Sequence, residues 1–270
     1  MRNYSADLVA LTDAARALAR SAGLAEPPSG GSLTVVGTGI RTIGQLTIES
    51  VALMASAESL FHVIGEPMQE EVLRVINPAA ETLTGLYVDG MDRGKTYEAM
   101  VQTITQSVFS GRRTVAAFYG HPGVFTYPTH ESVRRTRKAG YPARMLPAVS
   151  AEDCLFADLG IDPGDGCQAY EATDFLLGGR VVDIRSHLVI WQAGSIGNYT
   201  YEATQYDMSL LPQLVARLAS IYGPTHPLTV YEAPFEPGGI PTMRRVGVAY
   251  LHEGMLTLAS TLHIPPLAVQ

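Results

Sequence analysis

Apolar and polar positions recur along the chain in two different periods. From Ser32 onward, short apolar runs rich in Val, Leu and Phe are separated by longer segments whose apolar residues return every three or four positions. The first pattern is typical of buried strands and the second of amphipathic helices. We expect strands at 33–37, 59–65, 82–88, 113–120 and 143–149, and helices at 42–57, 68–76, 95–111, 128–140 and 151–160. This alternation predicts an α/β unit on a largely parallel sheet with helices on both faces.

A separate helix is expected ahead of this region. Over residues 5–25, with Ser5 as the expected N-cap, apolar side chains recur at helical spacing: Leu8, Leu11, Ala15, Leu18 and Ala22. The Pro- and Gly-rich stretch 26–31 then ends the helix and suits a linker. We favour packing of this helix on the body of the protein or on a second subunit, and the alternative is that it helps to cover a substrate groove.

The pattern changes after a Gly-, Pro- and Asp-rich segment at 158–166, which suits a second linker. Beyond it, strands are expected at 186–194, 228–235, 244–251 and 255–266, with one helix at 210–223. Because these strands outnumber the helices, an antiparallel or mixed sheet is favoured. The sequence therefore predicts three parts: a helix and linker over 1–31, an α/β domain over 32–160, and a smaller α/β domain with a mixed sheet over 161–270.

Composition limits the partners of the protein. The chain of 270 residues is long enough to bury a sizeable core, but only 17% of its residues are charged and its net charge is −7. Sparse charge implies much apolar surface, which favours oligomerisation. The acidic balance argues against nucleic-acid binding. We interpret the one basic run, at 134–138, as the solvated C-terminal end of a helix, where cations complement the helix dipole.

Cysteine usage and hydropathy indicate a soluble cytoplasmic protein with no membrane partner. The two cysteines, Cys154 and Cys167, have no CxxC spacing, which fits a reducing compartment. No apolar run reaches the roughly 18 residues of a membrane span. The N-terminus carries Asp7 and Asp13 and no apolar segment, so a signal peptide is a poor fit. The scattered histidines match no usual zinc spacing, so no metal is expected.

Two expected strands end in glycine-rich bends. VGTGI at 36–40 follows the first strand, and FYGHPGVF at 118–125 ends the fourth. Open α/β sheets bind ligands beside the carboxyl ends of their strands, so the two bends together predict one cofactor cleft. VGTGI has Thr42 where a dinucleotide fingerprint has its third glycine, and no GxxxxGK[ST] occurs, so neither a nicotinamide nor a nucleoside triphosphate site is indicated. Ser150 lacks the GxSxG setting of a nucleophile and is better explained as a helix N-cap.

One group of polar residues could carry chemistry. If a helix begins after Asp92 as its N-cap, Arg93 and Tyr97 stand four residues apart and share a face near its N-terminus, with Tyr87 shortly before them. A cation and a helix N-terminus both favour phenolate, so a buried Tyr97 could have a lowered pKa and act as a base. Spacing alone favours the alternative, in which the arginine stacks on the tyrosine for packing.

Several strings along the chain match a known family when they are taken together and in order: FYGHPGVF, MLPAVSAEDCLFADLGIDP, VIWQAGSIG and ASTLHIPP. They resemble the tetrapyrrole methylase superfamily of S-adenosylmethionine-dependent methyltransferases. More closely, they resemble the borosin α-N-methyltransferases, which methylate backbone amides of a ribosomally made precursor peptide. The resemblance runs from about Ser32 to about Pro266. Porphyrin-modifying members usually have GPGDP after the first strand, whereas Gly39 is followed here by Ile40-Arg41-Thr42, which favours the peptide branch.

The resemblance implies S-adenosylmethionine as the cofactor and assigns residues to two roles. Those that match catalytic positions are Tyr87, Arg93, Tyr97 and Tyr119. Those that match cofactor contacts are Tyr119, His121, Val124, Phe125, Ser150, Ala151, Gln192, Ala233, Ser260 and Thr261. A homodimer whose subunits cover each other's active sites is also implied. Fungal members are fused to their substrate peptide, whereas this sequence ends at Gln270, soon after the last expected strand, so we expect a split enzyme that acts on a separate precursor peptide.

The chemistry that this implies must overcome the poor nucleophilicity of an amide nitrogen, whose lone pair is delocalised into the carbonyl. We expect Tyr97, poised by Arg93, to take the amide proton, while Tyr87 or Arg93 stabilises charge on the carbonyl oxygen. Repeated methylation would require the extended peptide to shift by one residue. The alternatives are methylation of a small molecule such as a tetrapyrrole, which the missing GPGDP disfavours, and a catalytically silent protein that only binds cofactor or peptide.

Overall fold

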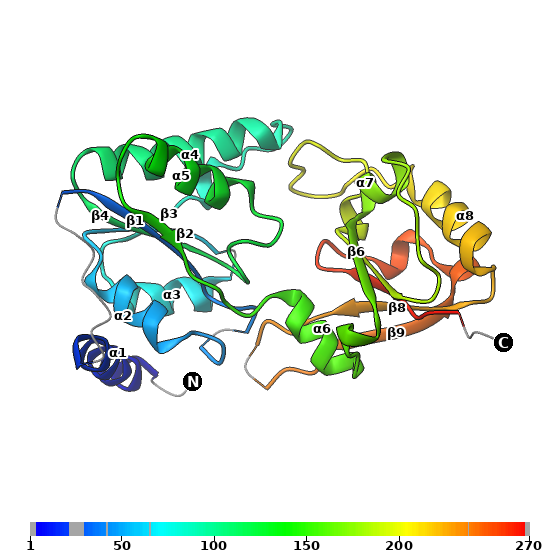
Figure 1. Ribbon diagram of the computed structural model, residues 1–270, viewed down its shortest axis with the longest axis horizontal. Coiled ribbons are helices and arrows are strands. Elements are labelled where there is room, and N and C mark those ends of the chain that lie inside the picture. Colours follow the sequence, from blue (N-terminus) through cyan, green and yellow to red (C-terminus); the bar gives the residue numbers. More distant parts are fainter. Residues whose placement is uncertain (1–3, 22–29, 42, 65, 237, 268–270) are drawn as a thin grey trace. The chain divides into compact units, whose positions relative to one another are not determined.

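The computed structural model describes residues 4–21, 30–41, 43–64, 66–236 and 238–267, and the chain forms two compact units (Figure 1). The N-terminal unit runs to Ala151 and the C-terminal unit begins at Glu152, with residues 235–237 grouped with the first. Each unit contains one five-stranded sheet. The α/β class, the parallel first sheet, the mixed second sheet and the additional N-terminal helix are confirmed.

The sheet of the N-terminal unit has the strand order β3-β2-β4-β1-β5, and every pairing in it is parallel. Its strands are β1 (Ser32–Gly37), β2 (Ser59–Val63), β3 (Ala80–Thr82), β4 (Arg113–Phe118) and β5 (Ala143–Met145). All six residues of β1 are buried, as expected for a central strand covered on both faces. β1 pairs with β4 up to Gly37 opposite Phe118, so both strands end at the same edge of the sheet.

Helices cover both faces of this sheet. They are α1 (Tyr4–Ser21), α2 (Ile48–Ser56), α3 (Pro67–Ile76), α4 (Arg93–Phe109) and α5 (Tyr127–Lys138). α2 and α3 lie on one face with α1 outside them, and α4 and α5 lie on the other (Figure 1). Val36 of β1 packs into the first of these layers, whereas Leu33 and Val35 pack into the second. This alternation of neighbouring residues gives the strand a core on each side.

The N-terminal helix α1 packs against α2 and α3 through one face. Leu8, Thr12 and Ala15 are buried there, and the guanidinium of Arg16 donates a hydrogen bond to the carbonyl oxygen of Ala55 at 2.7 Å. The described helix ends at Ser21. The expected final turn at 22–25, most of the expected linker and the side chain of the expected N-cap Ser5 lie outside the residues or side chains that are described.

Some element boundaries differ from those the sequence predicts. The helix expected at 42–57 begins only at Ile48, because the Thr47 hydroxyl caps it by accepting a hydrogen bond from the Ser50 amide at 3.0 Å. The strand expected at 82–88 is wrong over most of its length: β3 ends at Thr82 and residues Thr84–Leu86 form a 3₁₀ turn. A glycine in the middle of that segment favours the turn over the strand.

The C-terminal unit is built on a sheet of order β6-β7-β10-β8-β9, in which β6 and β7 are parallel and the other pairs antiparallel. Its strands are β6 (Cys167–Glu171), β7 (His187–Trp191), β8 (Pro227–Glu232), β9 (Thr242–Gly247) and β10 (Thr261–Ile264). Its helices are α6 (Ala151–Leu159), α7 (Ala172–Leu177) and α8 (Leu211–Tyr222). The sequence pattern misses β6 and α7, since β6 contains no buried residue and α7 is too short to show a helical period.

The two faces of the second sheet are covered differently. α7 and α8 pack on one face, around a core that includes Phe175, Leu214 and Leu218. On the other face, the Tyr231 hydroxyl of β8 donates a hydrogen bond to the Asp158 carboxylate of α6 at 2.8 Å.

The interpretation of the basic run as a solvated helix end is confirmed. Arg135, Arg137 and Lys138 lie in the last turn of α5. Arg135 makes a two-point ion pair with Glu98 of α4 at 2.6 and 2.7 Å, so its charge is paired with a carboxylate of the N-terminal unit. None of the described helices has the length and apolar character needed to cross a bilayer.

A buried histidine makes the N-terminal unit sensitive to acid. His62 on β2 is fully buried, and neither of its ring nitrogens has a hydrogen-bond partner among the described residues. Burial lowers the pKa of this imidazole below its usual 6.5; Glu70 opposes the shift and Arg74 adds to it. As the pH falls through 6.5, His62 binds a proton in the unfolded chain but stays neutral in the folded chain. The free energy of unfolding therefore decreases towards acidic pH.

We therefore expect His62→Leu to stabilise the protein by roughly 1–3 kcal/mol, since no unpaired polar group remains buried. The gain should be larger at mildly acidic pH than at mildly alkaline pH in urea unfolding followed by circular dichroism. His252 is exposed, and His252→Leu is the matched control that should change neither value. An equal gain from His62→Leu at both pH values would contradict the role assigned to its ionisation.

Candidate functional site

The bends after β1 and β4 lie against one another at the carboxyl edge of the first sheet. The amide of Gly120 donates to the carbonyl oxygen of Gly39 at 2.8 Å, and the amide of Gly39 donates to that of Gly120 at 3.3 Å. Both residues have positive φ, +73° and +69° for Gly39 and Gly120, which glycine adopts without strain. A Cβ at Gly37 would overlap the Gly120 carbonyl oxygen and approach Pro122 Cδ to 2.8 Å. The glycines therefore allow two backbone segments to close on each other.

Two glutamines hold the first bend, and the sequence pattern places one of them, Gln45, in a helix. In the structure, the Gln45 side-chain oxygen accepts hydrogen bonds from the backbone amides of Ile40 at 2.7 Å and Arg41 at 2.8 Å. The Gln69 amide of α3 donates to the Ile40 carbonyl oxygen at 3.3 Å. Both side chains satisfy backbone groups that have left the strand ladder. A glutamine a few residues after a glycine bend is the feature from which this role could have been inferred.

We expect Gln45→Ala to destabilise the N-terminal unit by about 1–3 kcal/mol, because two amides of the bend lose their acceptor. Urea unfolding measures this loss. Gln102→Ala is the matched control: Gln102 is exposed on α4, and among the described residues its side chain bonds only the Glu98 carboxylate, at 3.1 Å, so its loss should be negligible. Equal losses in the two variants would contradict the role assigned to Gln45.

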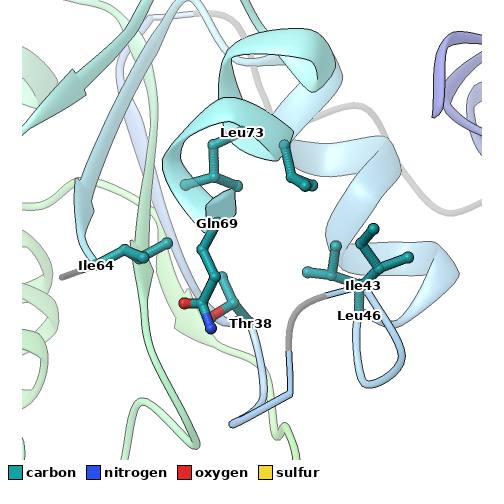
Figure 2. A pocket seen from close by; sticks show the side chains of 7 residues that line it. Thr38, Ile43, Leu46, Ile64, Gln69 and Leu73 are labelled. Atoms are coloured by element: carbon teal, nitrogen blue, oxygen red, sulfur yellow. The ribbon is translucent and has the colours of Figure 1, made fainter. Parts of the chain in front are cut away.

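A small apolar pocket lies between this bend and α3 (Figure 2). Its lining includes Ile43, Leu46, Ile64 and Leu73, with the Gln69 side chain beside Thr38 (Figure 2). The cavity measures about 10 Å³. That is room for about one water-sized group, so this pocket is too small to hold a cofactor.

An aromatic cluster lies at the start of α4. As expected, Asp92 caps this helix, and its carboxylate accepts a hydrogen bond from the Lys95 amide at 3.2 Å. The rings of Tyr87 and Tyr97 meet edge to face with their centroids 6.5 Å apart. The ring of Tyr127, the first residue of α5, lies 6.3 Å from Tyr97 by centroid, tilted by 30°. Tyr97 is therefore flanked by two aromatic rings, and the sequence did not point to Tyr127.

The tyrosines of this cluster influence one another's ionisation. Burial raises the pKa of Tyr87 well above its usual value; the neighbouring Tyr97 and Tyr119 add to the rise and Arg93 opposes it. The other three side chains expected to act in catalysis therefore lie within electrostatic reach of Tyr87. At neutral pH Tyr87 keeps its proton, so it can donate a hydrogen bond but cannot act as a base.

The remaining residues expected to contact the cofactor in the N-terminal unit follow β4 and β5. In the second bend, the His121 ring nitrogen Nδ1 accepts a hydrogen bond from the Gly123 amide at 2.9 Å, and Val124 is half-buried. Phe125 closes the bend with 52% of its surface exposed. Ser150 is buried before the start of α6, and Ala151, the first residue of that helix, is half-buried.

The expected contacts of the C-terminal unit lie at one edge of its sheet. Gln192 directly follows β7, Ala233 directly follows β8, and Ser260 directly precedes β10, whose first residue is Thr261. The antiparallel register of β10 with β7 and β8 brings these positions side by side. The buried Ser260 hydroxyl donates a hydrogen bond to the Glu232 carboxylate at 2.5 Å, which fixes the turn before β10.

Backbone strain is concentrated at these same edges. Among the described residues, the non-glycine positions with positive φ are Ile43, Phe125 and Gln192, which follow β1, β4 and β7. Such conformations cost of order 1–3 kcal/mol each and persist where the surrounding structure enforces them, which is common at binding sites. Phe125 and Gln192 are both positions at which a cofactor contact is expected.

Over the described ranges, no group of three or more His, Cys, Asp or Glu side chains could hold a metal ion.

Comparison with known proteins gives concordant results. The family model of the tetrapyrrole (corrin/porphyrin) methylases matches residues 32–233. The chain is 42% identical over 243 residues to the methyltransferase/ribosomally synthesized cyclic peptide omphalotin A precursor of Omphalotus olearius, a match covering 88% of this chain and 58% of that protein. It is 40% identical, with the same coverage of both chains, to the corresponding dendrothelin A precursor of Dendrothele bispora. The chain thus spans a little over half the length of these relatives.

Solved structures share the fold. The uroporphyrin-III-C-methyltransferase of Thermus thermophilus superimposes with a TM-score of 0.62 at 20% identity, covering 87% of this chain and 92% of that one. The methyltransferase CobJ superimposes with a TM-score of 0.59 at 15% identity, covering 89% and 96%. At these identities the likeness establishes the fold and nothing about the substrate.

Proposed function

The chain belongs to the tetrapyrrole (corrin/porphyrin) methylase family, and we propose that it transfers methyl groups from S-adenosylmethionine to backbone amide nitrogens of a substrate peptide, at several successive residues of that peptide. One observation supports the peptide substrate above the others. Tyr97, Arg93 and Tyr119 all act electrostatically on Tyr87, and Tyr119 directly precedes Gly120 of the second glycine bend, in a chain 42% identical to a cyclic-peptide precursor methyltransferase. A peptide amide is a substrate whose proton must be removed, and such a cluster of phenols and a guanidinium suits that task.

We propose that both units supply contacts to the methyl donor. The absence of a Cβ at Gly37 lets the two glycine bends close on each other, and we propose that this closure shapes the donor site on the N-terminal unit. The strained Phe125 and Gln192 and the buried Ser150 and Ser260 are further proposed contacts, with the others that the family resemblance assigns. When bound, S-adenosylmethionine supplies an electrophilic methyl group.

Within this proposal the residues of the cluster have separate tasks. Tyr97, acting in its phenolate form, accepts the amide proton and becomes a phenol, and the positive charge of Arg93 stabilises that phenolate before the transfer. Tyr87, whose pKa is raised by burial, stays protonated and donates a hydrogen bond to the peptide carbonyl oxygen, on which negative charge grows as the amide loses its proton. The amide nitrogen then carries the lone pair that would form the new N–C bond while the methyl–sulfur bond of the donor breaks and leaves its electron pair on sulfur.

We further propose that the enzyme is a cytoplasmic homodimer, as the family resemblance implies. Three apolar residues of α1 outside its buried set, Val9, Leu11 and Leu18, expose about half of their surface, at 47%, 45% and 51%. No disulfide joins Cys154 and Cys167, which suits a reducing compartment. Sedimentation velocity at micromolar concentration tests the dimer, and a species of 29.0 kDa alone would contradict it.

The test of the function is direct. The protein is incubated with S-adenosylmethionine and, as a separate molecule, the substrate peptide segment of the omphalotin A precursor. Tandem mass spectrometry should show successive additions of one methylene mass, located on backbone nitrogens by fragment ions. Methylation confined to side chains, or none although calorimetry shows the donor to bind, would contradict the proposal and favour a small-molecule methyltransferase or a silent binding protein.

A further inference from the structure

The C-terminal unit contains a cavity at the end of its sheet that is opposite to Gln192 and Ser260. It lies over the first residues of β8 and the last residues of β10, whereas the proposed donor contacts follow β7 and β8 and precede β10. The cavity measures about 340 Å³. This is within the range of small-molecule sites, which begins near 300 Å³.

The floor of the cavity is a row of polar side chains that crosses three strands in register. Thr229 on β8 pairs directly with Arg245 on β9 and with His263 on β10. Directly paired residues of neighbouring strands point to the same face of a sheet, with Cβ atoms about 5 Å apart. Leu228 and Val230, on either side of Thr229, pack into the core under α7 and α8. The polar row therefore points to the opposite face, where the cavity lies.

A pair of histidines extends this row. The Nδ1 atom of His187 on β7 lies 2.9 Å from the Nε2 atom of His263, and the two rings stack with centroids 5.1 Å apart. His263 is 93% buried, having 7% of its surface exposed. Burial lowers the pKa of His263 to about 4, and His187 adds to that shift. Both the geometry and the burial indicate a neutral pair that shares one hydrogen, so the positive charge of the row belongs to Arg245.

The cation of the row is available to a ligand. Within the described part of the chain, neither the Arg245 guanidinium nor the Thr229 hydroxyl has a hydrogen bond or an ion pair. The walls of the cavity are apolar and come from Leu159, Pro227, Met243 and Pro265. A guanidinium and a hydroxyl on the floor suit an oxyanion, and apolar walls suit the body of the molecule that carries it.

We propose that this cavity binds a small molecule in which a carboxylate or phosphate is attached to a compact apolar group. The oxyanion accepts hydrogen bonds from the Arg245 guanidinium and the Thr229 hydroxyl, and His263 contacts it from the buried side of the row. The apolar group packs between the end of α6 and the two prolines. Nothing in this assignment depends on the methyl donor or on the peptide substrate.

The experiment is calorimetric titration of the full-length protein with two probes of equal apolar part, phenyl phosphate and benzoate. We expect one or both to bind, and the stronger of the two identifies the oxyanion class. Arg245→Gln should weaken that binding by at least about tenfold, as expected for loss of a charge-assisted pair. Arg244→Gln is the matched control, because it removes the same charge from the next residue of β9, on the other face of the strand.

The outcomes are distinct. Weakening by Arg245→Gln with binding by Arg244→Gln unchanged supports the site, provided that thermal unfolding of the two variants matches the wild type. Thr229→Val, which keeps the shape of the side chain and removes its hydroxyl, should weaken binding as well. Failure of both probes to bind, or equal weakening by both arginine variants, overturns the proposal. A change of sedimentation coefficient in Arg245→Gln, with no change in probe binding, also overturns it, because the row would then be a subunit contact.

Discussion

Tyr97→Phe is expected to reduce methyl transfer by about 10²–10⁴-fold, the usual contribution of a positioned proton acceptor, while binding of the methyl donor stays unchanged. The substitution removes one oxygen and keeps the ring, so the packing of Tyr97 between Tyr87 and Tyr127 is preserved. Since an amide nitrogen cannot attack the methyl group before its proton is displaced, the loss should appear in kcat rather than in KM. Single-turnover mass spectrometry and calorimetric titration with S-adenosylhomocysteine measure the two quantities.

Tyr127→Phe is the matched control for this prediction. It removes the same atom from the ring on the other side of Tyr97, where 52% of the residue's surface is exposed. We expect methyl transfer at a rate within about twofold of the wild type, because the Tyr127 hydroxyl has no assigned role in proton transfer. Wild-type turnover in Tyr97→Phe would show that Tyr97 is not the base and would leave a solvent route to accept the proton.

Much of the fold could be predicted because burial imposes a visible period on the sequence. β1 is buried throughout and β4 from its second residue onward, and the glycine bends that follow these largely apolar runs stand out against them. Asp92 also identified the start of α4, since an acidic N-cap is a local feature that needs no tertiary information. Where a few neighbouring residues determine the local structure, the sequence pattern was sufficient to predict it.

The rest of the candidate site depends on contacts between distant segments. The segment containing Tyr87 resembles a strand in its composition, yet a 3₁₀ turn at Thr84–Leu86 directs the chain so that its ring meets Tyr97. Gln45 has the propensity of a helix residue, yet the helix begins only after the Thr47 cap, and the Gln45 side chain satisfies the Ile40 and Arg41 amides instead. Local propensity cannot report such needs, because the unsatisfied groups exist only after the bend has formed.

Gly37→Ala should have the largest effect on the N-terminal unit, because it separates the two glycine bends. An added Cβ overlaps the Gly120 carbonyl oxygen and the Ala148 side chain and lies 2.8 Å from Pro122 Cδ. Backbone and proline atoms cannot rotate away, so β1 or the second bend must shift. We expect a loss of about 2–4 kcal/mol in urea unfolding, typical of severe overpacking, and no measurable binding of S-adenosylhomocysteine.

Gly85→Ala separates this steric effect from the general cost of replacing glycine. A Cβ at Gly85 meets no atom within 4 Å, and the residue is not among those with positive φ, so the change should be within about 0.5 kcal/mol. If Gly37→Ala were as stable as Gly85→Ala and still bound the donor product, the closure of one bend on the other would not be what shapes the donor site. Loss of binding with stability retained would instead place Gly37 in direct contact with the ligand, because only the approach of the donor to that backbone would then have been blocked.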